Sequence, residues 1–134
     1  MKKNIMIQKI AGVAVIKKGN RYLILKRSKK LDYPYKWSFV AQRVHFGENI
    51  IDALFHGVKD ETKLNVRTYK FFKTYSIVKK VKGVKQHLSF IVFICESSGK
   101  AKLNWESLDY KWVSLKDLRK FDLTHIARMI VKDL

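Results

Sequence analysis

The sequence predicts a single α/β domain, on three observations. A chain of 134 residues lies in the common size range of single domains and can enclose one hydrophobic core. The hydrophobic fraction of 47% is that of a globular protein, so the high net charge is not expected to prevent folding. Strand-like and helix-like segments follow one another with no linker, repeat or low-complexity tract between them. We therefore expect one domain over residues 1–134.

The first part of the chain predicts a β-hairpin followed by a basic loop. Residues 11–16 are apolar and largely β-branched, residues 19–20 supply a Gly-Asn turn, and residues 22–25 resume the apolar run. Residues 26–36 are polar and basic and include a Tyr-Pro-Tyr sequence, which is typical of a surface loop. A short strand is expected to begin at Trp37.

An amphipathic helix is predicted from Glu48 to about Lys63. Its apolar residues recur at helical spacing and place one stripe toward the core: Ile51, Leu54, Phe55 and Val58. A second set follows at steps of four and is expected to stack along the opposite face: Glu48, Asp52, His56 and Asp60, with Glu61 beside them. This acidic face is either a cation site or a solvated surface that neutralises nearby lysines.

The second half of the chain predicts another hairpin, a short strand and a closing helix. Residues 67–80 and 86–96 read as long strands separated by a basic turn at 79–85. Residues 110–113 form a further short strand, and residues 124–134 carry a helical pattern.

The net charge points to an anionic partner. Lys and Arg number 29 against 11 Asp and Glu, which gives a formal net charge of +18. Such an excess repels itself unless an anion is usually nearby, so nucleic acid, phosphate-rich ligands and acidic membrane surfaces are the candidate partners. The alternative is that solvated lysines simply fill surface positions.

Cysteine content and hydropathy predict a cytoplasmic protein. Cys95 is the single cysteine and lies in an apolar run, so it is expected to pack as a small hydrophobe and forms no internal disulfide. Charged residues interrupt every apolar run before membrane-spanning length, and no long apolar segment follows the basic amino terminus. We therefore expect neither secretion nor a membrane span.

The order of the elements, together with the acidic helix, resembles a Nudix domain along almost the whole chain. The box of that family reads G-x5-E-x7-R-E-U-x-E-E-x-G-U, where U is a bulky aliphatic residue, and it would run here from Gln42 to Leu64. Glu48 holds the first glutamate, and Asp60 and Glu61 hold the last acidic pair. The resemblance implies an α/β/α sandwich, in which a mixed sheet carries the box helix on one face and a C-terminal helix.

This chain departs from the box at positions that serve catalysis in the resembled enzymes. His56 stands at the arginine, Gly57 at the glutamate that follows it, and Lys63 at the later glycine, while residues 40–42 read Val-Ala-Gln instead of Pro-Gly-Gly. In the resembled enzymes the glutamate replaced by Gly57 is a metal ligand and often activates water. A glycine inside a helix costs roughly 0.5–1 kcal/mol relative to alanine, which indicates either close backbone packing or loss of selection for catalysis.

The resemblance implies a site for Mg²⁺ or Mn²⁺, because carboxylates gathered on one helix suit hard divalent cations that bridge protein and diphosphate. The metal ligands would be Glu48, Asp60 and Glu61, with Glu106 facing the box from a later segment, and the catalytic residues would be Glu61 and Asp60. His56 is expected to be a solvated or hydrogen-bonded helix residue and not a ligand.

Basic residues offer a second route to function. We expect phosphate or nucleic-acid binding by residues in the basic loop, beside the box and at the second hairpin: Lys26, Arg27, Lys29, Lys30, Arg43, Lys79, Lys80, Lys82 and Lys85. Aromatic residues lie among the first of them, and cations interleaved with aromatic rings suit nucleotides or single-stranded nucleic acid.

Two hypotheses about function follow. The first is a Nudix-like domain that binds RNA or another phosphate-rich ligand, or joins a ribonucleoprotein assembly, and whose hydrolysis is lost or vestigial. The second is a magnesium-dependent hydrolase that cleaves a nucleoside diphosphate derivative at its pyrophosphate. The sequence favours the first, because the central glutamate, the arginine and the Pro-Gly-Gly turn are all replaced.

Overall fold

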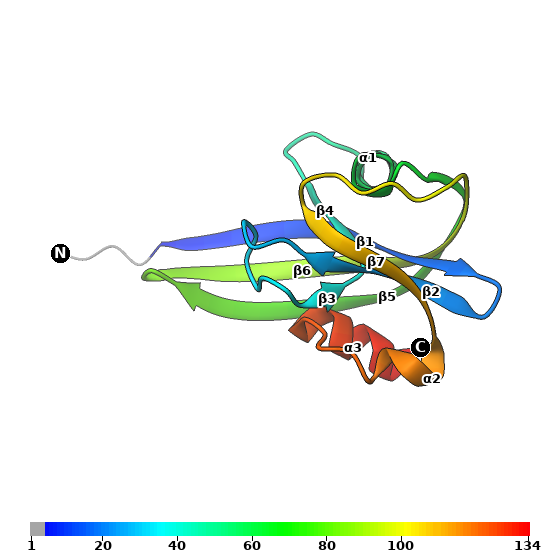
Figure 1. The fold of residues 1–134 in the computed structure, drawn as a ribbon. Coiled ribbons are helices and arrows are strands. Elements are labelled where there is room, and N and C mark those ends of the chain that lie inside the picture. The colour runs from blue at the N-terminus through cyan, green and yellow to red at the C-terminus, as the bar shows by residue number, and fades with distance from the viewer. Residues whose placement is uncertain (1–4) are drawn as a thin grey trace.

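A mixed β-sheet lies between helices on its two faces (Figure 1). The computed structural model describes residues 5–134. Within that part of the chain the elements are β1 (Met6–Lys18), β2 (Arg21–Arg27), β3 (Trp37–Ser38), β4 (Val40–Val44), α1 (Ile50–Thr62), β5 (Asn65–Val81), β6 (Val84–Ser98), β7 (Ser107–Ser114), α2 (Leu115–Leu118) and α3 (His125–Asp133). Helix α1 covers one face, and α2 and α3 cover the other, which confirms the expected α/β/α arrangement.

Strand β1 is central to the sheet and pairs with β2, β4 and β6. It runs parallel to β6 from Met6 opposite Lys85 to Ile16 opposite Cys95, and its far edge pairs antiparallel with β4. Only its last residues pair with β2, which in turn pairs with β3 and β7. The parallel pair makes the sheet mixed, and the long crossover between β1 and β6 carries α1 to the face it covers.

Two apolar cores fill the space on either side of the sheet. The core under α1 contains Leu54, Val58 and Cys95, and the core under α2 and α3 contains Trp37 and Ile130. Cys95 is fully buried, as the apolar run around it predicted. Among the described residues, no helix is both long and apolar enough to cross a membrane.

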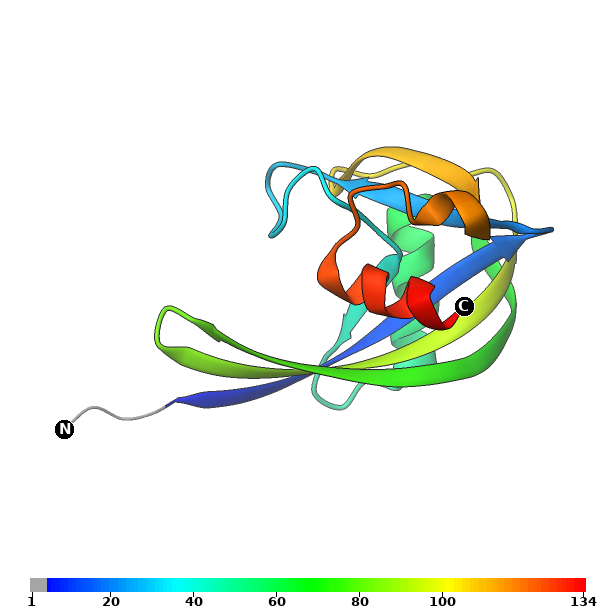
Figure 2. The ribbon, with the colours of Figure 1, turned by 90° about the horizontal axis from the view of Figure 1, so that it is seen from below.

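The second hairpin is longer than the sequence predicted. Strands β5 and β6 pair in regular register from Lys73 opposite Val92 to Val81 opposite Val84, so the turn is Lys82-Gly83 and not the whole segment 79–85. Both turn residues have positive φ, 49° and 80°, the backbone of a tight two-residue hairpin. Figures 1 and 2 show that this hairpin and the start of β1 project beyond the body of the molecule.

Helix α1 begins later than the sequence predicted. Asn49 is its N-cap, and the Asn49 side chain accepts hydrogen bonds from the backbone N–H groups of Ile51 and Asp52. Glu48 therefore lies in the turn before the helix, and the prediction that it stacks with Asp52 and Asp60 on one helix face is wrong. Lys63 ends the helix in the left-handed conformation with φ 62°, which is why the box favours glycine there.

Candidate active site

The last turn of α1 brings two carboxylates to the sheet. Asp60 is exposed, whereas Glu61 is only 7% exposed although it carries an ionisable group. The Oε2 atom of Glu61 is buried and has no hydrogen-bond partner among the described residues. Leaving a buried polar atom without a partner is costly, so this oxygen suits a ligand that the protein alone does not supply.

Glu61 is electrostatically coupled to its neighbours. Burial, together with the negative charges of Glu106 and Asp60, raises the pKa of Glu61 to about 8, and the positive charge of Arg27 opposes this rise. The pKa of Glu106 is also raised, by burial and then by Asp60. Asp60, Glu61 and Glu106 are termed the acidic cluster below. Their charges act together to disfavour ionisation of Glu61 and Glu106, which a cation would relieve.

A loop and a strand end hold the acidic cluster in place. The Asn104 side chain donates a hydrogen bond to Asp60 Oδ2 at 3.3 Å and accepts one from the Glu106 backbone N–H at 2.9 Å. The Ser28 backbone N–H donates to the Glu106 carbonyl at 2.9 Å, which ties the end of β2 to the same loop. The prediction that Glu106 faces the box is consistent with these contacts and with its effect on Glu61.

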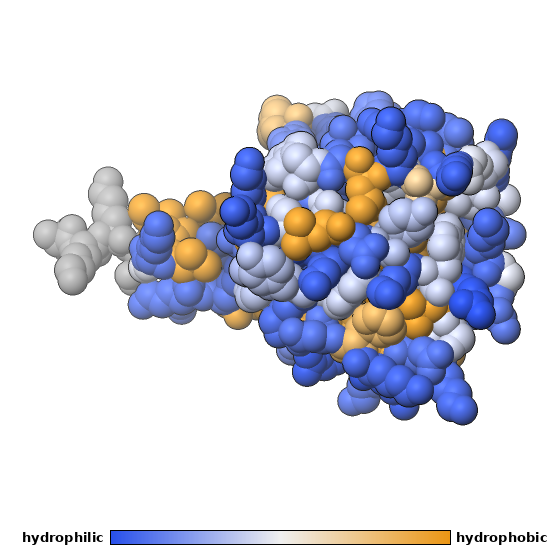
Figure 3. Space-filling model, viewed as in Figure 1, coloured by the Kyte–Doolittle hydropathy of each residue, from blue (hydrophilic) through white to orange (hydrophobic). Residues whose placement is uncertain are grey.

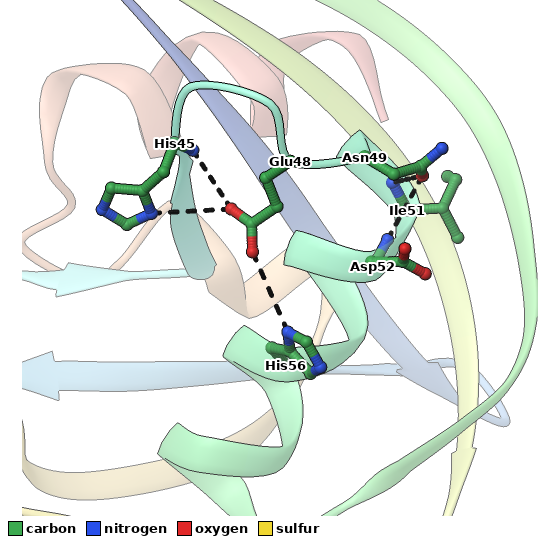
Figure 4. Close-up of polar contacts among 6 residues, drawn as sticks. All are labelled: His45, Glu48, Asn49, Ile51, Asp52 and His56. Carbon is green, nitrogen blue, oxygen red and sulfur yellow. Dashed lines mark hydrogen bonds and ion pairs between the residues drawn. The ribbon is translucent and has the colours of Figure 1, made fainter.

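Glu48 belongs to a different arrangement, with two histidines (Figure 4). Its Oε1 accepts a hydrogen bond from the His45 backbone N–H at 3.1 Å and lies 3.5 Å from His45 Nδ1, and its Oε2 lies 3.9 Å from His56 Nδ1. The pKa of Glu48 is lowered, chiefly by the hydrogen bond from His45. His56, which replaces the box arginine, thus stays beside the first glutamate as an exposed side chain.

Gly57 is buried in the middle of α1 and packs against Gln42 of β4. A Cβ atom at position 57 would lie 2.6 Å from the Gln42 Cβ and 3.1 Å from its Cγ, which is closer than non-bonded carbon atoms approach. Close packing against Gln42 therefore accounts for the glycine at position 57. Of the two explanations that the sequence left open, the structure supports close backbone packing.

The acidic cluster has the chemistry of a divalent-cation site. Within residues 5–134, no three His, Cys, Asp or Glu side chains already stand at distances that would hold a metal ion. The cluster nevertheless supplies only oxygen donors, the type that Mg²⁺ and Mn²⁺ prefer, and one of them is buried and unpaired. Asp60, Glu61 and Glu106 therefore offer donors of the right chemistry for such an ion, whereas Glu48 is engaged with His45 and His56.

A pocket of about 360 Å³ is lined in part by Arg27, whose positive charge also acts on Glu61 and Glu106. Its apolar lining comes from the β5–β6 hairpin and α3, including Ile77, Phe90 and Ile126, and its polar lining includes Arg27 and Thr124. The sequence pattern did not predict this pocket. The register of β5 and β6 places Ile77 and Phe90 on one face of the sheet, and the sequence pattern specified neither this register nor the space beside the C-terminal helix.

Of the predicted basic residues, Arg27 and Lys79 line the pocket and the others lie outside its lining. The Nε of Arg27 donates to the Asp32 carbonyl at 2.6 Å, and Arg27 both lines the pocket and acts by its charge on Glu61. Lys79 lines the same pocket, with its Nζ 5.3 Å from the centre of the Tyr33 ring, so the basic loop and the hairpin meet there. The structure does not bring the remaining predicted basic residues into the pocket lining: Lys26, Lys29, Lys30, Arg43, Lys80, Lys82 and Lys85.

Comparison with known proteins decides the family. The model of the NUDIX domain matches residues 6–134. The chain belongs to the Nudix family. An 8-oxo-dGTP diphosphatase of Buchnera aphidicola subsp. Schizaphis graminum is 27% identical over 91% of this chain and 89% of that protein. The nucleoside triphosphatase NudI of Escherichia coli is 26% identical over 95% and 96% of the two chains.

Solved structures of Nudix proteins share the fold. A MutT NUDIX hydrolase from Burkholderia pseudomallei superposes with a TM-score of 0.85 at 19% identity, covering 96% of this chain and 98% of the other. The NUDIX domain of Shewanella oneidensis NrtR, crystallised with ADP-ribose, superposes with a TM-score of 0.72 at 12% identity, covering 99% and 87%. At these identities the likeness is one of fold.

Proposed function

We propose that this Nudix domain binds a nucleoside phosphate and slowly hydrolyses its phosphoanhydride bond with Mg²⁺ or Mn²⁺. The observation that carries the proposal is the buried, unpaired carboxylate oxygen of Glu61 within the acidic cluster, together with an apolar pocket lined by Arg27, whose charge acts on Glu61. The relatives named as nucleotide diphosphatase and triphosphatase support hydrolysis over the purely binding role that the altered box favoured.

The pocket suits a nucleoside. A base would lie against the apolar side chains of Ile77 and Phe90, and the Tyr33 ring at the rim offers a stacking surface. The phosphates would then extend past Arg27, whose guanidinium is a donor for phosphate oxygens and is fixed in place by its bond to the Asp32 carbonyl. This orientation brings the anhydride bond toward the acidic cluster.

The acidic cluster would act on the anhydride bond. Asp60, Glu61 and Glu106 are the residues that would hold the cation, and a cation held there offsets negative charge that develops on phosphate oxygens. Because burial and the neighbouring carboxylates raise the pKa of Glu61 to about 8, the carboxyl group would hold its proton more strongly in the metal-free protein than with a cation bound beside it. In its ionised form, Glu61 would be the proposed acceptor of a proton from water.

Turnover is expected to be slow, because Gly57 leaves the cluster without the carboxylate that the box normally places in its middle. We expect common nucleoside triphosphates, 8-oxo-dGTP, ADP-ribose and dinucleoside polyphosphates to be cleaved at less than about 1 s⁻¹, the low end of ordinary enzymes. Glu61→Gln should abolish the residual rate, whereas Asp52→Asn, an exposed change on the same helix, should not. A rate that survives Glu61→Gln or chelation of divalent cations would contradict the proposal.

RNA binding is a second candidate, favoured by the projecting hairpin. Lys79, Lys80, Lys82 and Lys85, termed the hairpin lysines below, lie at its end. Figure 3 shows hydrophilic residues over much of the visible face and beside apolar ones on the projection. Phosphates of a flexible chain would contact the lysines, and a base would enter at the Tyr33–Lys79 contact. A ribonucleoprotein partner and a cytoplasmic location remain predictions.

A further inference from the structure

Gln42 and Gly57 face each other across the contact between β4 and α1. Gln42 pairs with Gly12 on β1, and strand alternation turns it to the same side as Val40, which lies in the core under α1. The Oε1 of Gln42 lies 3.1 Å from the point where a Cβ of residue 57 would begin. The Gln42 side chain therefore occupies the start of the path that a longer side chain at position 57 would take.

The two positions exclude each other's side chains. A separation of 2.6 Å between Cβ positions cannot be relieved by a change of rotamer, because both atoms are attached directly to the backbone. One of the two residues must be glycine while β4 and α1 keep their spacing. The Nudix box has glycine at the position of Gln42 and glutamate at the position of Gly57. In this chain the larger side chain is on β4 and the glycine is on α1.

We propose that Gln42 replaces the missing box glutamate, so that its side-chain carbonyl oxygen is a neutral ligand for the cation held by the acidic cluster. Asp60 and Glu61 lie three and four residues after Gly57, one helical turn away on the same side of α1. Amide carbonyl oxygens are accepted ligands of hard cations. The inference rests on the proposed function for the existence of the cation site, and on the packing at Gly57 for the identity of the ligand.

The packing exchange is tested by thermal unfolding. Gly57→Ala should lower the melting temperature by about 5 °C or more, although alanine favours helix. Adding Gln42→Ala should not restore it, because the offending Cβ remains. In the background of Gln42→Gly, however, Gly57→Ala should be neutral or stabilising. If Gly57→Ala alone is as stable as the wild type, β4 and α1 can move apart at little cost. The claim that side chains at positions 42 and 57 exclude each other would then be wrong.

The ligand role is tested with Mn²⁺ as the probe, titrated into metal-free protein and followed by electron paramagnetic resonance. Gln42→Glu should tighten binding about tenfold or more, because affinity follows ligand charge, and Gln42→Leu, of similar volume, should weaken it several-fold. Gln86→Glu on the projecting part of β6 is the matched control for the added charge and should leave binding unchanged.

A second readout follows the wild-type protein. Its sequence contains three glutamines, Gln8, Gln42 and Gln86, so their side-chain amide signals are readily assigned by NMR. Mn²⁺ should broaden the Gln42 amide at concentrations that leave that of Gln86 sharp. Equal broadening of the two, or equal Mn²⁺ affinity of the wild type, Gln42→Glu and Gln42→Leu, would overturn the ligand role.

The two proposals fail in different ways. If Glu61→Gln abolishes Mn²⁺ binding but no change at Gln42 alters it, the cation site stands and Gln42 is only a packing residue. If Glu61→Gln leaves Mn²⁺ binding unchanged, or if neither the wild type nor Gln42→Glu binds Mn²⁺, the cation site of the proposed function is itself wrong.

Discussion

Replacing Glu61 by glutamine should stabilise the metal-free protein, and the gain should grow as the pH rises from 5 to 8. The carboxyl of Glu61 has a pKa of about 8 in the folded chain, against an ordinary value of 4.5. Between those values the folded state keeps a proton that the unfolded state gives up, so the free energy of unfolding falls as the pH rises. The contribution is fully present below pH 4.5 and is lost by pH 8 and above.

The size of this change in the free energy of unfolding follows from the shift in the pKa of Glu61. One pH unit within this window is worth up to about 1.4 kcal/mol, so the wild type should lose a few kcal/mol relative to Glu61→Gln between pH 5 and pH 8. Glutamine keeps the shape of the side chain and cannot ionise, and every other titrating group is common to both proteins. The difference between the two pH profiles therefore reports the carboxyl of Glu61.

Urea unfolding in EDTA at several pH values measures this difference. Asp52→Asn removes an exposed carboxylate from the same helix and serves as the control, with a profile parallel to that of the wild type. Adding Mn²⁺ should reverse the ranking at pH 8, because a cation that binds the folded wild type stabilises it. Parallel profiles for wild type and Glu61→Gln would show that Glu61 is not held in a desolvated, negatively charged environment.

Three further predictions concern other parts of the chain. Lys63→Gly should raise the free energy of unfolding by about 1 kcal/mol in urea titrations, because glycine adopts the left-handed conformation of that residue without strain. Tyr75→Phe should lower it by about 1–2 kcal/mol in the same assay, because the Tyr75 hydroxyl donates a 2.7 Å hydrogen bond to Asp133 that joins β5 to α3. Replacing the hairpin lysines by glutamine should reduce the slope of log affinity for single-stranded RNA against log salt by up to about one unit per lost contact. No RNA affinity at low salt would remove the second candidate function.

The fold was largely predictable because it depends on local patterns. Apolar periodicity located the two hairpins and the helices, and the order of these elements, with Glu48 and the acidic pair at box spacing, indicated the family that the comparison confirms. The boundaries were less accurate. The helix began two residues late because Asn49 caps it, and the second hairpin continued to a Lys82-Gly83 turn because cross-strand bonds do not require apolar side chains.

The sequence alone determined which residue types are available, and tertiary structure decided what each of them meets. Gly57 read equally well as lost catalysis or as close packing, and only the approach of β4 showed that Gln42 excludes a side chain there. Glu48 and Glu61 looked equivalent along the chain. In the fold Glu48 is partly exposed and pairs with two histidines, whereas Glu61 is buried and feels the charges of two other carboxylates. Ionisation depends on solvent exposure and on charges brought together across the chain, which helical spacing does not specify.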